Sequence, residues 1–215
     1  MTISLLVDNP KSWIMPYAQQ LVTDLKPEHD IYLFSEAAEI KTGDCAFFLG
    51  CEKLVKEDIL KRNKHNLVIH ESALPAGKGW SPLTWQILAG QNEIPITLFE
   101  AETTVDSGPI YFQEKINFAG HELIDELREQ QGAKTISLIK KFIAAYPTLT
   151  GRAQTGPESF YPRRRPQDSE LDINKTIAEQ FNFLRVVDNE RYPAFFNYRG
   201  QKYLLKIFKD DQNIK

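Results

Sequence analysis

Cysteine is scarce in this chain of 215 residues. Cys45 and Cys51 are the only two, too few for a disulfide framework, and a zinc site would need several histidines beside them. Unpaired cysteines tend to be buried, so two free thiols are the simplest interpretation. No apolar run approaches the roughly 18 residues of a membrane-spanning helix, and residues 1–8 carry no basic leader. We therefore expect a cytoplasmic protein without a membrane partner.

An excess of basic residues is also lacking. The chain has 26 Lys and Arg against 29 Asp and Glu, a formal charge of −3 at pH 7. Proteins that bind nucleic acid without sequence preference need a positive field, so we expect no nucleic-acid partner. The part after residue 150 is nevertheless net positive, which suits a phosphorylated small molecule.

Apolar patterns alternate between strand and helix along most of the chain. We predict strands at residues 3–7, 31–34, 45–49, 67–69, 94–99 and 110–116, and helices at 14–25, 54–60, 81–88 and 121–146, with a break at Gly132. Such alternation implies an α/β domain with a mostly parallel sheet and a ligand site outside the carboxyl ends of the strands. The composition changes near residue 150, so we predict one domain over residues 1–150 and a short extension over 151–215. This extension would contain a surface connector (147–168), a helix (173–186) and a hairpin (194–198 and 203–208).

The short motifs of P-loop, dinucleotide-binding, zinc-protease and serine-hydrolase enzymes are absent. His70 stands instead at the end of a predicted strand, before a loop with Gly77 and Gly79, and Asp106 follows in an Asp-Ser-Gly-Pro stretch. Two interpretations are open from the residues alone. His70 is a core imidazole and Asp106 a turn residue, or a carboxylate holds a histidine that shuttles protons at neutral pH.

Residues 66–116 resemble the folate-dependent formyltransferases, the family of the methionyl-tRNA and glycinamide ribonucleotide formyltransferases. The resemblance implies a Rossmann-like catalytic domain over residues 1–150, with N10-formyltetrahydrofolate as formyl donor and tetrahydrofolate as product. It implies catalytic roles for His70, Asp106 and Ser72. The positions that match the family pattern in order are His70, Ser72, Leu74, Pro75, Gly79, Pro82, Trp85, Gly90, Thr97, Asp106, Gly108 and Ile110.

Two loops resemble the segments that hold the folate in this family, the first by its backbone around the pterin. The cofactor-binding residues implied by position are Glu52, Lys53, Leu54, Glu102, Thr103, Thr104, Val105 and Asp106.

The family pattern is broken at one position, where Val68 replaces a catalytic asparagine. An asparagine amide would donate a hydrogen bond to the oxyanion, and its loss typically lowers the rate about 10²-fold to 10³-fold. Ser72 and a protonated His70 are both open as replacement donors.

Residues 161–169, 183–187 and 193–195 resemble the branch that formylates nucleotide-linked amino sugars. This resemblance implies a UDP- or dTDP-linked 4-amino-4,6-dideoxy hexose, including pseudaminic-acid-type sugars of bacterial surface polysaccharides. The arginines suit phosphate and the aromatic rings suit stacking, although solvated charges and packing rings are the plain alternatives. The implied substrate residues are Lys78, Trp80, Arg163, Arg164, Arg165, Arg185 and Tyr192.

Two other functions are open. The chain could formylate a carrier-tethered amino acid, or, with Val68 in place of asparagine, it could be a catalytically silent folate-binding protein. The exposed edge of the predicted C-terminal hairpin favours a homodimer.

Overall fold

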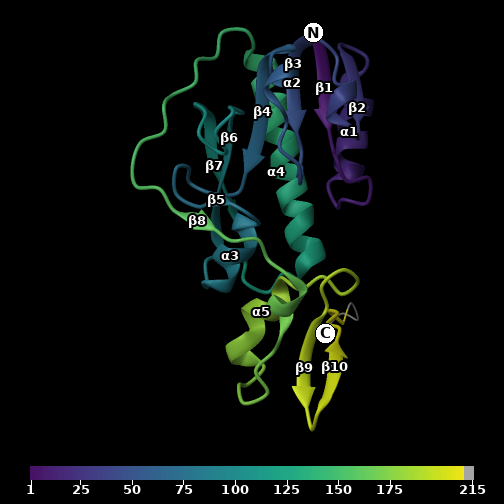
Figure 1. The fold of residues 1–215 in the computed structure, drawn as a ribbon, viewed down its shortest axis with the longest axis vertical. Coiled ribbons are helices and arrows are strands. Elements are labelled where there is room, and N and C mark those ends of the chain that lie inside the picture. Colours follow the sequence, from purple (N-terminus) through teal and green to yellow (C-terminus); the bar gives the residue numbers. More distant parts are fainter. Residues whose placement is uncertain (211–215) are drawn as a thin grey trace.

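The computed structural model describes residues 1–210 and has at its centre a six-stranded sheet in the order β2-β1-β3-β4-β6-β7 (Figure 1). The first four of these strands are parallel: β1 (Thr2–Leu6), β2 (Asp30–Phe34), β3 (Gly43–Phe48) and β4 (Asn63–His70). β6 (Glu93–Glu100) and β7 (Ile110–Asn117) are antiparallel additions at one edge. The prediction of a mostly parallel α/β sheet is confirmed.

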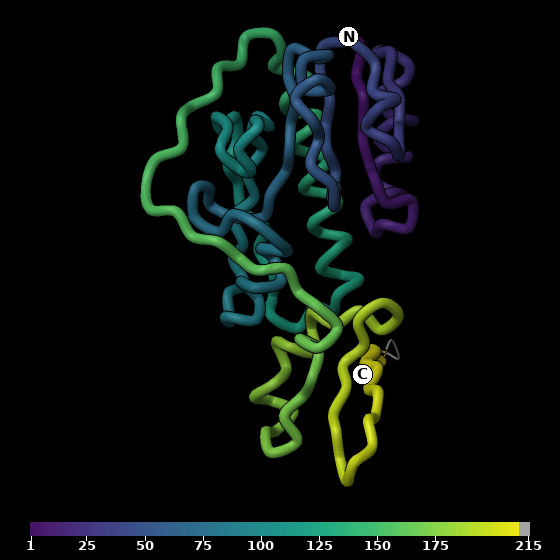
Figure 2. The backbone as a smooth tube through the Cα atoms, in the orientation of Figure 1, coloured from purple at the N-terminus to yellow at the C-terminus, as the bar shows by residue number. Residues whose placement is uncertain are grey.

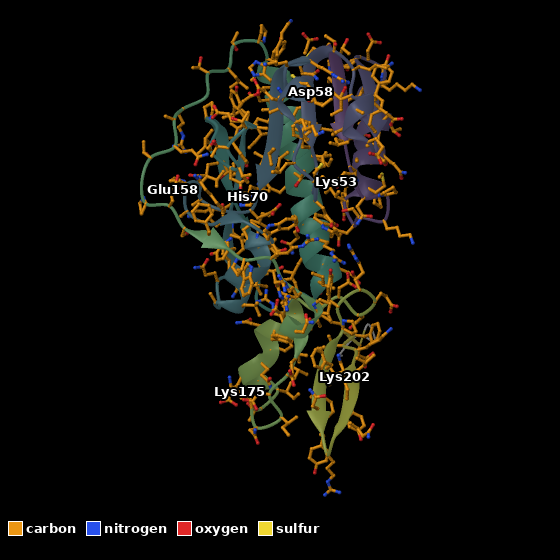
Figure 3. All side chains as sticks on the ribbon, viewed as in Figure 1. Lys53, Asp58, His70, Glu158, Lys175 and Lys202 are labelled. Carbon is orange, nitrogen blue, oxygen red and sulfur yellow. The ribbon has the colours of Figure 1, made fainter. Side chains whose placement is uncertain are left out.

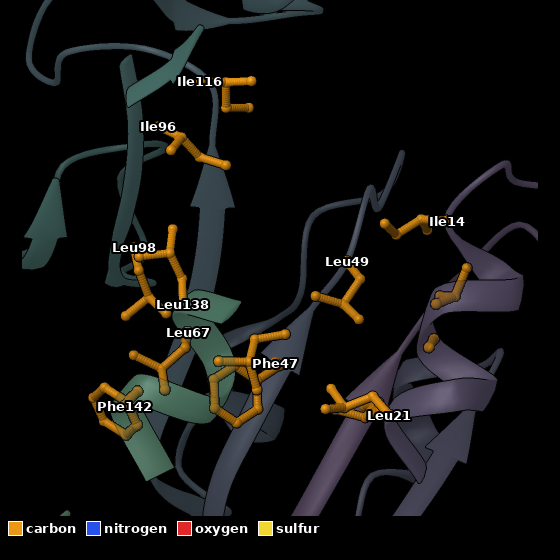
Figure 4. Close-up of a cluster of buried hydrophobic side chains, with 14 of the residues drawn as sticks. Ile14, Leu21, Phe47, Leu49, Leu67, Ile96, Leu98, Ile116, Leu138 and Phe142 are labelled. Carbon is orange, nitrogen blue, oxygen red and sulfur yellow. The ribbon is translucent and has the colours of Figure 1, made fainter. Parts of the chain in front are cut away.

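Helices cover both faces of the sheet because the buried strands are apolar on both sides. α1 (Met15–Leu25) and α4 (Ile124–Ala145) pack on one face, where Leu21, Leu138 and Phe142 meet Phe47 and Leu67 (Figure 4). Each such fully buried side chain stabilises the fold by about 1.5 to 3 kcal/mol. The short α2 (Glu57–Leu60) and a 3₁₀ turn, η1 (Ala37–Glu39), contribute to a smaller cluster on the other face.

The predicted break at Gly132 is wrong, since α4 is continuous through it. A Cβ atom at Gly132 would lie 2.6 Å from Cε1 of Tyr17 on α1. This glycine therefore lets α1 and α4 approach each other closely.

Cys45 and Cys51 are free thiols, as predicted. Burial raises the pKa of each to about 12. No helix among residues 1–210 is both long enough and apolar enough to cross a membrane.

The connector passes over the surface and returns beside α3 (Pro82–Leu88) (Figure 2). On its way it forms β8 (Phe160–Tyr161), which pairs in parallel with β5 (Lys78–Gly79). Neither strand was predicted. The connector ends in a 3₁₀ turn, η2 (Pro166–Ser169).

The predicted helix over residues 173–186 is confirmed in its second half and wrong over residues 173–177. Only η3 (Ala178–Gln180) and α5 (Phe181–Arg185) are helical. Before residue 178, side chains accept hydrogen bonds from backbone N–H groups: Asp172 accepts from the N–H of Asn174, and Glu179 accepts from the N–H of Thr176. Such local bonds compete with helix formation.

The predicted hairpin is confirmed as β9 (Ala194–Tyr198) and β10 (Gln201–Leu205). β10 begins two residues earlier than expected because Tyr198 pairs directly with Gln201 across a two-residue turn. The domain division at residue 150 stays a prediction.

A buried ion pair joins α5 to the loop between β7 and α4. Arg185 is 0% exposed and donates to the carbonyl and carboxylate of Glu122, and also to the side chains of Asn92 and Asn182. The carboxylate of Glu122 accepts from three backbone N–H groups, at residues 119–121. Burial by itself raises the pKa of Glu122, but these backbone hydrogen bonds outweigh burial and lower it from 4.5 to about 2.

A carboxyl group with a lowered pKa stabilises the fold above its unfolded pKa and loses that contribution as the pH falls through the folded value. We expect the Glu122 contribution to be complete above about pH 4.5 and to vanish towards pH 2. Glu122→Gln should lower the free energy of unfolding at pH 7 by about 3 kcal/mol and flatten its decline in acid. Urea unfolding at pH 7, 4.5 and 3 measures this, with the exposed Glu190→Gln as control. An unchanged acid dependence in Glu122→Gln would contradict it.

Candidate functional site

The site lies at the carboxyl edge of the parallel strands, where β4 ends on His70 (Figure 3). The His70 ring is buried, and its Nε2 lies 2.9 Å from the carbonyl oxygen of Gly77. Because a carbonyl only accepts, Nε2 carries the hydrogen of the neutral ring and Nδ1 holds the basic lone pair. The imidazole is thus fixed in one tautomer by the Gly77 turn.

Asp106 completes the pair predicted from the sequence. Its Oδ2 lies 3.9 Å from Nε2 of His70 and accepts the Gly79 N–H at 2.9 Å. Asp106 adopts a left-handed backbone, with φ at +53°. The Gln154 side chain donates to the carbonyls of both Asp106 and Gly108, at 3.0 and 2.9 Å. The carboxylate is therefore held close to the His70 ring.

Gly108 lets the Asp106 loop pass directly against β6. A Cβ atom at Gly108 would lie 1.9 Å from the carbonyl oxygen of Glu100. The backbone N–H of Glu100 also donates to the carbonyl of Pro109. Any side chain at position 108 would push the loop, and Asp106 with it, away from the strand.

Ser72 follows His70 closely and is 2% exposed. Its N–H donates to the His70 carbonyl, and its own carbonyl accepts from the Thr97 hydroxyl. Among residues 1–210 its Oγ has no hydrogen-bond partner. A hydroxyl that is buried and unbonded beside His70 is free to bond a ligand, which fits a folate-type cofactor at this edge.

Val68 lies on the same face of β4 as His70, because side chains repeat every second residue. It packs against an apolar cluster of Leu74, Phe99 and Ile110. Valine has no hydrogen to donate, so position 68 offers a ligand only apolar contact.

The two predicted cofactor loops flank His70. The first continues β3, where the N–H groups of Glu52 and Lys53 both donate to the Asp8 carboxylate at 2.7 to 3.0 Å. These donors are therefore occupied, and the loop presents its other backbone groups and the exposed Leu54. The second loop joins β6 to β7. Residues in it that were predicted to hold the cofactor and are exposed are Glu102, Thr103, Thr104 and Val105.

Lys78 is nearly buried despite its charge. Its Nζ lies 2.5 Å from Glu158 of the connector. The side chain lines a cavity of about 520 Å³ together with Glu102, Ser107 and Gln154. Its neighbours in the chain, Gly77 and Gly79, hold His70 and Asp106, so Lys78 belongs to the wall of the site.

Three predicted substrate residues gather beside the first cofactor loop. The guanidinium of Arg163 lies 4.3 Å from the ring of Trp80 and donates to Glu52 at 3.1 Å. Tyr192 is exposed, and its ring lies 6.0 Å from the Arg191 guanidinium, which is itself 3.9 Å from Glu52.

The other three arginines have different surroundings. Arg164 donates to the Asp168 carbonyl, and burial lowers its pKa. Arg165 is exposed, and its backbone N–H donates to Asp168. The prediction that Arg185 meets the substrate is wrong, because the side chain is 0% exposed and its hydrogen bonds go to Glu122, Asn92 and Asn182.

Several contributors to the site were missed. Asp8 was not among the predicted site residues, although its place after β1 at the carboxyl edge is a usable signal. The sequence carries no signal for Gln154 or for the Gly77 carbonyl. A single glutamine in a connector belongs to no recognisable motif, and every residue has a backbone carbonyl. Arg191 lies outside the Arg163–Arg165 run that drew attention.

The family model described as formyl transferase matches residues 28–139, more than half of the chain. This chain belongs to the formyl transferase family. A curated relative, the methionyl-tRNA formyltransferase of Thermus thermophilus, is 25% identical over 171 residues, which are 79% of this chain and 55% of the relative. The chain thus spans about half the length of the curated relatives it matches.

Solved structures share the fold of this formyl transferase. The methionyl-tRNA formyltransferase from Clostridium thermocellum has a TM-score of 0.83 at 18% identity, over 99% of this chain and 96% of that one. A 4-N formyltransferase from Francisella tularensis has a TM-score of 0.76 at 16% identity, over 98% of both chains. HypX from Aquifex aeolicus in complex with tetrahydrofolic acid has a TM-score of 0.78 at 17% identity, over 96% of this chain and 37% of that one.

The close contact at Gly108 gives a direct test of how the Asp106 loop is held. We expect Gly108→Ala to destabilise the protein by at least about 2 kcal/mol, or roughly 4 to 8 °C in Tm for a chain of this size. Gly200→Ala is the control: it also strains the backbone, at a φ of +76°, but meets nothing within 4 Å, and should cost about 1 kcal/mol. Equal thermal shifts in the two variants would show that the Glu100 contact does not constrain the loop.

Proposed function

We propose that this formyl transferase moves the formyl group of N10-formyltetrahydrofolate to the amino group of a nucleotide-linked amino sugar. The observation that carries the proposal is the His70–Asp106 pair, held at the ligand edge of the sheet by Gly77, Gly79 and Gln154. The family match and the likeness to HypX with tetrahydrofolic acid support the donor.

When bound, N10-formyltetrahydrofolate supplies the formyl carbon and its tetrahydrofolate nitrogen as leaving group. The neutral His70 accepts the proton that the attacking amine must lose, Asp106 stabilises the resulting imidazolium, and His70 then returns the proton to the leaving nitrogen. Ser72 has the free hydroxyl that can donate to the negative charge developing on the formyl oxygen, and protonated His70 is the alternative donor. Proton transfer by a positioned side chain typically contributes about 10²-fold to 10⁴-fold to the rate.

Two features favour a nucleotide-linked sugar as the acceptor. Arg163 and Arg191 lie with the rings of Trp80 and Tyr192 beside the first cofactor loop, a combination suited to a phosphate and a ring. The 4-N formyltransferase from Francisella tularensis shares the fold along nearly the whole chain. We infer a UDP- or dTDP-linked 4-amino-4,6-dideoxy hexose, and a homodimer formed through β9 and β10 stays a prediction.

The proposal is tested by mass spectrometry of the purified protein with N10-formyltetrahydrofolate and a panel of UDP- and dTDP-linked amino sugars. Methionyl-tRNA and a carrier-tethered amino acid are included as rival acceptors. We expect one formyl group to be added to one sugar. His70→Asn and Asp106→Asn should each reduce the rate at least about 10²-fold, whereas the exposed His121→Asn and Asp58→Asn should not.

Any other result of this assay would support a different function. Product only with methionyl-tRNA or the carrier would refute the sugar acceptor but retain the transferase. Folate binding with no product from any amine would favour a silent binding protein.

Val68 provides a gain-of-function test of the missing donor. We expect Val68→Asn to raise kcat, by up to about 10²-fold if the amide reaches the formyl oxygen. Val68→Ile, which adds apolar volume without a donor, should not raise it. Initial rates per folded protein, with folding followed by circular dichroism, measure the change. A well-folded Val68→Asn with unaltered kcat would mean that another group already supplies the hydrogen bond.

A further inference from the structure

Two arginines from separate parts of the chain reach the same carboxylate. Arg163 of the connector lies 3.1 Å from Oε2 of Glu52, and Arg191, from the segment between α5 and β9, lies 3.9 Å from Oε1. The side chain of Asn9 also donates to Oε1, at 3.1 Å. Glu52 is thus surrounded by donors from three segments.

This cluster contributes little to the stability of the fold. The side chains of Arg163, Arg191 and Glu52 are 56%, 43% and 40% exposed, and exposed ion pairs are worth little because water and salt screen them. The loop is fixed without them, since Asp8 holds the N–H groups of Glu52 and Lys53. The Glu52 side chain can therefore rotate away while its backbone stays in place.

The surroundings suit a larger anion than a carboxylate. Trp80 and Tyr192 flank the arginines with exposed rings. Guanidinium groups bind phosphate oxygens in pairs, and aromatic faces stack on planar rings. With Glu52 in place, Arg163 and Arg191 keep one net positive charge, and without it they have two.

The cluster lies at the same edge of the sheet as His70. Glu52 follows β3, whose last residue, Phe48, pairs with Val68 on β4, shortly before His70. Figure 3 shows Lys53, the neighbour of Glu52, at the level of His70. Trp80 directly follows Gly79, whose N–H holds Asp106. A molecule whose anionic group is bound here can therefore extend towards the candidate catalytic pair.

We propose that Glu52 is an internal occupant of an anion site made by Arg163 and Arg191, and that the diphosphate of the substrate displaces it. The identity of this anion rests on the proposed function. A singly charged anion gains little by replacing a carboxylate of equal charge, whereas a diphosphate brings more charge and more oxygens to the same two guanidinium groups. Glu52 thus selects for diphosphates against small monovalent anions.

Binding of UDP, inorganic pyrophosphate and acetate, measured by isothermal titration calorimetry without any formyl donor, tests this. Glu52→Gln should bind UDP and pyrophosphate about fivefold to tenfold more tightly, the scale of one exposed charge at close range, and should also begin to bind acetate. Arg163→Gln and Arg191→Gln should each bind UDP more weakly. The matched control is Glu57→Gln, which removes an equal charge from an exposed pair with Lys61 and should match the unmodified protein.

Two results would overturn the proposal: Glu52→Gln binding UDP no more tightly than Glu57→Gln, or both arginine variants retaining full affinity. Failure of the proposed function looks different. UDP binding that tightens in Glu52→Gln, with no sugar formylated, would leave the anion site intact and refute the sugar transferase. If a sugar is formylated but the affinity for UDP is the same in Glu52→Gln as in the unmodified protein, the sugar transferase is supported and the anion site is refuted.

Discussion

The hydrogen bond between the Gly79 N–H and the Asp106 carboxylate is the contact on which the candidate site depends. It fixes the loop between β6 and β7 against the segment whose Gly77 carbonyl orients His70. That segment is in turn held by the connector, through the pairing of β5 with β8 and the bond from the Gly77 N–H to Ser159. The connector is therefore part of the site, although none of its residues is among the catalytic candidates.

The sequence predicted the strands of the six-stranded sheet and the long helices well because these elements are long enough to show a period. The apolar residues of α1 recur at helical spacing, and β1, β3 and β6 are recognisable as apolar runs of strand length. β5 and β8 have two residues each, too few for any period, and they pair across a long stretch of chain. The first five residues of the helix predicted over 173–186 show the opposite error, because local side-chain hydrogen bonds there override the apolar spacing.

Site residues were predictable where residue type and position agree. His70 and Asp106 were found because a motif places both, and the structure brings them together. Arg185 was misassigned because an arginine fork suits a phosphate and a set of buried carbonyl and carboxylate oxygens equally well. Sequence does not state burial, and burial decides between these two partners. Gln154 was missed for a related reason: it acts on the carbonyls of Asp106 and Gly108, which no residue type reveals.

Val68 and the unbonded Ser72 hydroxyl together affect how the site can stabilise the negative charge that develops on the formyl oxygen. A buried hydroxyl without a partner costs about 1 to 3 kcal/mol, and Ser72 Oγ has none among residues 1–210. That cost is offset if a ligand oxygen accepts its hydrogen. Because Val68 makes the adjoining wall apolar, such an oxygen would find few other donors there, and a hydrogen bond in an apolar setting is stronger than one in water. The serine hydroxyl, or the His70 imidazolium as the alternative donor, can thus supply part of the stabilisation that the missing amide would give.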